Sequence, residues 1–149
     1  MPPTVCMTGH CPLPAFQAAP PPDRGVTLQD QMAHLNPLDT WAVSELNSGD
    51  EEASVAQMLQ EGTAIAVSDG SHCPGHSTSA FILTRRSKKG PSFVNVRGSN
   101  VVPGNPQEQD SYRAELGGVM GIAIALQLIC SLHRVTHGSI EIGLDGESA

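Results

Sequence analysis

One segment without charges constrains the fold more than any other part of this chain. After Arg113 and Glu115, residues 116–132 (LGGVMGIAIALQLICSL) carry no charged side chain. A membrane span needs about 20 apolar residues, whereas this segment is shorter and contains Gln127 and three glycines. We therefore interpret it as a buried core helix, over about residues 111–133, with no membrane partner. Such a helix needs a second layer to pack against.

Short apolar runs before and after this helix supply that layer. Three precede it and one follows it, and all four have the length and composition of strands: TAIAVSDGS, TSAFILTRR, SFVNVRG and GSIEIGLDG. The polar stretch SKKGP between the second and third runs predicts an antiparallel hairpin. A helix between the third and fourth runs predicts a parallel pair of strands. The expected class is α/β with a mixed sheet.

The N-terminal part of the chain has a different composition. Most of the prolines lie in residues 1–25, where we expect no regular element. Residues 1–61 hold eight acidic side chains and a single basic one, and SGDEEASVAQMLQEG predicts a short helix near their end. We expect residues 1–61 to be a proline-rich, acidic tether or connector, and residues 62–149 to form the folded domain.

The charge balance bears on possible partners. The net charge of −7 would by itself argue against nucleic acid, but residues 62–149 contain seven acids and seven bases. Five bases fall in the predicted hairpin and could contact phosphates: Arg85, Arg86, Lys88, Lys89 and Arg97. The alternative is a solvated hairpin tip, because edge strands often carry such residues against aggregation.

The cysteines and histidines indicate the cellular compartment and argue against zinc. Four cysteines show no regular framework, and the N-terminus lacks the pattern of a secretion signal. We expect free thiols in an intracellular protein, cytoplasmic or nuclear, that is not secreted. His72, Cys73 and His76 include no C-x-x-C pair, so we read them as a loop rather than a zinc site. Tyr112 is expected to pack at the entrance of the long helix.

Three carboxylates are the candidates for chemistry. Asp69 and Asp145 each follow an apolar strand and precede a glycine, and Glu115 opens the connecting helix. If the two strands are parallel neighbours, both aspartates lie at the carboxyl edge of the sheet, where α/β proteins bind ligands. A row of small residues would let the helix approach closely and direct Glu115 toward them: Gly117, Gly121 and Ala125.

Converging carboxylates repel one another unless a cation is present. Mg²⁺ or Mn²⁺ prefers such oxygen ligands, and a pair of ions supports in-line displacement at a phosphodiester. Taken singly, each residue has a simpler explanation. An Asp-Gly pair usually marks a turn, and a glutamate in the first helical turn complements the helix dipole.

Three motifs together carry a family resemblance. AIAVSDGS, QDSYRAELGGVMGIAIAL and IEIGLDGESA, in this order, resemble the ribonuclease H domain at the end of retrotransposon reverse-transcriptase polyproteins. The resemblance covers about residues 60–149 and implies a ribonuclease H-like mixed sheet. It also implies that Asp69, Glu115 and Asp145 are metal-binding catalytic acids for two Mg²⁺ or Mn²⁺ ions. The implied substrate is the RNA strand of an RNA–DNA hybrid, and the implied partner is the rest of the polyprotein.

The sequence departs from the family pattern at its end. The fourth acid, fifth strand and closing helices of the family would follow position 145, so we expect only the first part of the domain, with its last strand at an open edge. Two hypotheses follow. The chain belongs to a metal-dependent endoribonuclease, or it is an inactive retroelement-derived fragment that at most binds nucleic acid. We expect the isolated chain to be catalytically silent and poorly stable.

Overall fold

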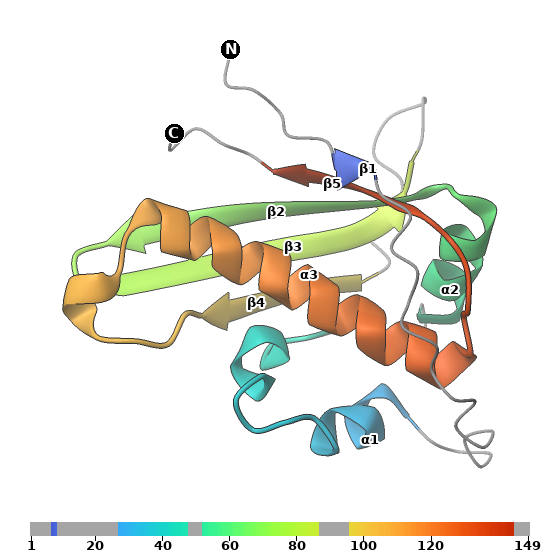
Figure 1. Cartoon of the computed structure of the whole chain (residues 1–149), viewed down its shortest axis with the longest axis horizontal. Coiled ribbons are helices and arrows are strands. Elements are labelled where there is room, and N and C mark those ends of the chain that lie inside the picture. The colour runs from blue at the N-terminus through green and yellow to red at the C-terminus, as the bar shows by residue number, and fades with distance from the viewer. Residues whose placement is uncertain (1–6, 9–26, 48–51, 87–95, 145–149) are drawn as a thin grey trace.

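A single mixed sheet organises the molecule (Figure 1). The computed structural model describes residues 7–8, 27–47, 52–86 and 96–144. The strands lie in the order β1-β5-β2-β3-β4. In chain order the elements are β1 Met7–Thr8, α1 Leu28–Ala33, the 3₁₀ helix η1 Thr40–Val43, α2 Glu52–Glu61, β2 Ala64–Cys73, β3 His76–Arg85, β4 Val96–Val101, the 3₁₀ helix η2 Pro106–Glu108, α3 Ser111–His133 and β5 Ile140–Leu144.

The predicted α/β class and strand directions are confirmed. β2 pairs with β3, and β3 with β4, in antiparallel ladders, whereas β2 and β5 are parallel neighbours. α3 lies between β4 and β5 in the chain and provides the crossover that a parallel pair requires. This topology brings two segments far apart in the sequence, residues 64–68 and 140–144, into one ladder.

One local prediction was wrong. The Asp69–Gly70 pair does not end its strand, because β2 continues to Cys73 and pairs with His76 at the start of β3. The reversal falls instead at Gly75, whose φ of +84° is a conformation that glycine adopts without steric cost. The tight hairpin therefore lies between β2 and β3, and residues 72–76 are strand ends and a turn rather than a long loop.

The core lies between the sheet and α3. Over Ala64–Ser68 of β2 and Ser77–Leu83 of β3, every second side chain is buried on the side of the helices, as the two-residue period of a strand requires. Phe81, Ile122 and Ile129 are among the fully buried side chains of this layer. α3 is long and apolar enough to cross a membrane, but 56% of its apolar window is buried inside the molecule.

The segment before the sheet shares this core. Leu28 at the start of α1 and Ala42 and Val43 of η1 are buried in the same cluster as the residues of α3. Thr27 and Asp30 cap α1 reciprocally, and the backbone N–H of Thr27 lowers the pKa of the Asp30 carboxyl. α2 forms where the sequence predicts a helix.

β1 departs from the expectation for residues 1–25. Met7 and Thr8 form a short strand that pairs antiparallel with Ile142 and Glu141 of β5. A two-residue bridge needs no periodic sequence pattern, because its stability comes from backbone hydrogen bonds to an existing strand. The composition of this region therefore gave no indication of it.

Candidate functional site

The beginning of α3 rests directly on β2. A Cβ atom added to Gly70 would lie 2.7 Å from the carbonyl carbon of Ala114 and 2.7 Å from the backbone nitrogen of Glu115. Atoms cannot approach so closely without moving the backbone, so glycine is required at this position. The second residue of the Asp69–Gly70 pair thus permits the contact between the strand and the helix that carries Glu115.

The predicted close packing of α3 is confirmed further along the helix. A Cβ on Gly117 would lie 2.5 Å from Val102 Cγ2, and one on Gly121 would lie 2.5 Å from Phe81 Cε1. Gly118, which is not part of the predicted small-residue row, is constrained as well, since a Cβ there would lie 2.7 Å from Ser68 Cβ. The helix therefore has little freedom to slide or rotate on the sheet.

A buried amide side chain ties four parts of the molecule together. Asn100 of β4 is 3% exposed, and its Nδ2 donates to the carbonyl oxygens of Ala42, at 3.0 Å, and Gly117, at 3.1 Å. Ser79 Oγ donates to Asn100 Oδ1 at 2.6 Å. Buried amides are stable only when satisfied in this way. Sequence reasoning missed Asn100, although a polar residue at an inward position of a strand was the available signal.

Side-chain hydrogen bonds also fix the start of α3. Asp110 accepts a hydrogen bond from the backbone N–H of Arg113 as the N-cap of the helix. Arg113 donates back through Nε and Nη2 to the carbonyl oxygen of Pro103, and Ser77 Oγ donates to the carbonyl oxygen of Asp110. The position of the turn that contains Glu115 is therefore set by β3, by the preceding loop and by the cap.

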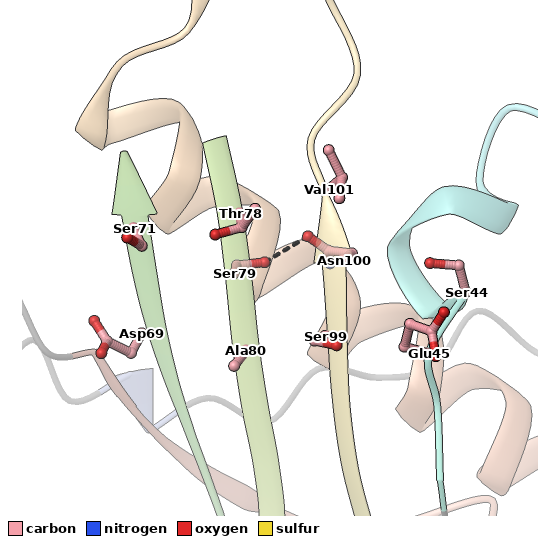
Figure 2. A pocket seen from close by; sticks show the side chains of 10 residues that line it. All are labelled: Ser44, Glu45, Asp69, Ser71, Thr78, Ser79, Ala80, Ser99, Asn100 and Val101. Carbon is pink, nitrogen blue, oxygen red and sulfur yellow. Dashed lines mark hydrogen bonds between the residues drawn. The ribbon is translucent and has the colours of Figure 1, made fainter. Parts of the chain in front are cut away.

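Asp69 itself points to the other face of the sheet. It is exposed, and it lines a pocket of about 410 Å³ across β2, β3 and β4 (Figure 2). Residues of the three strands form the floor, most of them small or hydroxyl-bearing: Ser71, Thr78, Ser79, Ala80, Ser99, Asn100 and Val101. Ser44 and Glu45, which follow η1, close the far side. None of these pocket residues except Asp69 was singled out for catalysis from the sequence.

The structure describes two of the three predicted acids, Asp69 and Glu115. Glu115 is half-buried at the α3 end that touches Gly70. Ser68 pairs with Leu144 in the parallel ladder, so the ladder is formed up to the residue before Asp69. Asp145 lies outside the described residues. Within the described ranges, no group of three or more His, Cys, Asp or Glu side chains is arranged to hold a metal ion.

The predicted basic patch is only partly free to meet phosphates. Arg85 pairs with Glu61 at 3.8 Å, and Arg86 forms an ion pair with Glu141. Arg85 lies five residues along β3 from Ala80, the strand partner of Asp69, which is about 17 Å at 3.4 Å per residue. Lys88 and Lys89 lie outside the described residues.

Arg97 differs from the two arginines of β3. It is exposed on β4, two residues from the pocket residue Ser99 and on the same face of the sheet. The backbone N–H of Arg97 donates to the carbonyl oxygen of Asn47 at 3.0 Å, and the carbonyl oxygen of Arg97 accepts from the N–H of Asn47 at 2.8 Å, so the backbone of Arg97 is held in place. Of the predicted phosphate-binding bases that the structure describes, Arg97 is the one that lies on the same face of the sheet as the pocket and next to one of its residues in register.

The expected packing of Tyr112 at the entrance of α3 is wrong. Its side chain is 70% exposed and lies on the solvent side of the helix.

The expected free thiols are found at the two described cysteines. Cys73 and Cys130 are both free thiols, and burial raises the pKa of the Cys130 thiol.

Comparisons with known proteins add no relative to this picture. Searches against protein-family models, curated proteins and solved structures found no significant match. The class that the structure defines is therefore a mixed α/β fold, and any function rests on the residues themselves.

Proposed function

We propose that this chain belongs to a metal-dependent endonuclease that hydrolyses the RNA strand of RNA–DNA hybrids, as part of a retroelement reverse-transcriptase polyprotein. Asp69, Glu115 and Asp145 are the proposed catalytic, metal-binding residues. The observation that carries the proposal is the contact between Gly70 and the Ala114–Glu115 backbone. This contact places the backbone of the first acidic motif against the start of α3, which carries the second, although Gly70 and Ala114 are 44 positions apart in the chain; the Asp69 side chain itself lies on the opposite face of β2.

The parallel ladder supports the third member of the set. β5 runs beside β2 and is paired up to Ser68 and Leu144, the residues that precede Asp69 and Asp145 in the sequence. Open α/β sheets bind ligands at the carboxyl ends of parallel strands. Asp69 lies in β2 directly after its last residue paired with β5, and Asp145 is the residue after β5 in the sequence, as the motif order of the resembling family implies.

The chemistry of the donors fits the proposed cofactor. Carboxylate oxygens are the ligands that Mg²⁺ and Mn²⁺ prefer, and Asp69 is exposed and lines an open pocket rather than being buried. Two such ions, when bound, would activate a water and stabilise the leaving oxygen. Asp69, Glu115 and Asp145 would hold the ions, and the tight packing of α3 on the sheet keeps the backbone of Glu115 in place.

The substrate and partners follow from the resemblance. An RNA–DNA hybrid would meet the face that carries Asp69, where Arg97 is the described base closest in register to the pocket. Arg85 and Arg86 form ion pairs with Glu61 and Glu141, so they are less available to bind phosphates. The remainder of a reverse-transcriptase polyprotein is the proposed covalent partner, in an intracellular setting.

Metal binding tests the proposal on this chain directly. We expect Mn²⁺ to raise the melting temperature, since a ligand at about ten times its Kd stabilises the folded state by about 1.4 kcal/mol. Asp69→Asn should abolish that shift. Asp39→Asn is the matched control, because Asp39 makes no side-chain cap hydrogen bond at η1. An equal Mn²⁺ shift in both variants would contradict the assignment.

Cleavage tests the reaction. Labelled RNA–DNA hybrid is incubated with Mg²⁺ and either the chain or a version extended by the sequence that follows Ala149 in its source, because the resemblance implies a fourth acid there. We expect cleavage of the hybrid by the extended version and none of duplex DNA. Cleavage that persists in Asp69→Asn would reject the proposed role of this residue. An extended version that binds the hybrid without cutting it would favour the inactive-fragment hypothesis.

A further inference from the structure

The outer edge of β5 is barely covered in the described part of the chain. One edge of β5 pairs along its whole length with β2, whereas on the other edge the described residues that pair with it are Met7 and Thr8. All five residues of β5 are half-buried rather than buried. A strand in this position exposes backbone N–H and C=O groups that can pair with another strand.

β5 also lacks the features that normally protect such an edge. Its sequence, IEIGL, contains no proline and no lysine. Its one charged residue, Glu141, is already in an ion pair with Arg86. The charge that could repel an incoming strand is thus largely neutralised from within the molecule.

We propose that the outer edge of β5 is a strand-docking surface that β1 covers in the monomer, and that a second copy of this chain occupies it when β1 is displaced. The occupant is β5 of the second copy, paired antiparallel about a two-fold axis. β1 itself shows that the edge accepts an antiparallel strand.

The number of paired residues on the outer edge of β5 favours a second copy of β5 over β1. β1 contributes two residue pairs, whereas two β5 strands centred on Ile142 would contribute five. An antiparallel pair of identical strands is self-complementary, so the contact closes as a dimer and does not propagate. The two-residue β1 is correspondingly easy to displace.

Proline substitution in the full chain tests this surface. Met7→Pro/Thr8→Pro removes the backbone N–H donors of β1, whereas the control Met7→Ala/Thr8→Ala keeps them. We expect light scattering to give a mass that rises toward the dimer with concentration for the proline variant only. Hydrogen exchange of the β5 amides should show protection that increases with concentration, and α3 protection reports that the fold is intact.

A peptide supplies the converse experiment. A synthetic peptide of residues 4–11 should compete for the edge and return the proline variant to the monomer. A proline variant that stays monomeric with rapidly exchanging β5 amides would overturn the second-copy occupant. One that stays monomeric with unchanged β5 protection would show that β1 is not the cover. If the proline variant loses α3 protection as well, single Thr8→Pro is used with the same readouts.

Discussion

The two faces of the sheet differ in what they demand of the sequence. On the face covered by α3, side chains are buried and glycines are required because a single added carbon would collide with a neighbour. On the opposite face, Asp69 and the pocket residues Ser71, Thr78 and Ser99 are exposed. Neighbouring residues on one strand therefore belong to different environments, since side chains alternate between faces.

Because of this difference, substitutions on one face are expected to change the stability of the fold, and substitutions on the other are expected to change the candidate site. Changes on the helix-covered face remove packing or create overlap, both of which cost free energy of unfolding. Changes on the open face alter what a ligand would meet and leave the core intact. Adjacent residues on the same strand thus form matched pairs in which one member tests the fold and the other tests the site.

The largest effect is expected at Phe81. This side chain is 2% exposed and is enclosed by Gly98 and Gly121, so Phe81→Ala would leave a cavity. We expect a loss of about 3–5 kcal/mol in the free energy of unfolding, measured by urea denaturation. Ala80→Ser, one residue away on the open face, should change it by less than about 0.5 kcal/mol. Equal losses in the two variants would remove the distinction between the faces.

A smaller effect is expected at Gly70. Gly70→Ala forces the start of α3 away from β2 and should cost about 1–3 kcal/mol, whereas Ser71→Ala should be close to neutral. Because Gly70 supports the turn of Glu115, Gly70→Ala should also weaken the Mn²⁺ shift in melting temperature. Full stability and an unchanged shift in Gly70→Ala would show that the contact is not needed to position the helix.

The smallest effect concerns two thiols and depends on pH. Burial raises the pKa of Cys130, so its contribution to stability is present below the ordinary thiol pKa and is lost as the pH rises through the folded-state value. Unfolding free energies from pH 7 to 10 should therefore fall more steeply for the parent chain than for Cys130→Ala. Peptide mapping should find exposed Cys73 alkylated well before Cys130. Parallel pH profiles would contradict the role of Cys130.

Local pattern was sufficient for the long helix and the strand directions. The charge-free run over residues 116–132 and the crossover logic correctly predicted α3, the mixed sheet and the parallel pair of β2 and β5. The small-residue row was also informative, because glycine in a helix costs about 1 kcal/mol and implies close packing. These features follow from the order and spacing of residues along the chain.

Other features depended on partners distant in sequence. Asp69–Gly70 looked like a turn, but pairing with β3 extended the strand to Cys73, because ladder hydrogen bonds override a local turn preference. Asn100 became a buried hub only because Ala42 and Gly117 were brought to it. β1 is defined by its pairing with β5, which lies more than 130 positions away in the chain.

The candidate site likewise has features that the sequence predicts and features that only the folded structure reveals. The sequence alone named Asp69, Glu115 and Asp145, because acids beside strand and helix ends can be recognised from their immediate neighbours. Only the tertiary structure showed that Gly70 lies against the backbone of Glu115, that Arg85 and Arg86 are paired with acids, and that a hydroxyl-lined pocket adjoins Asp69. Such features depend on which residues the folded sheet brings together, and distances along the chain do not specify them.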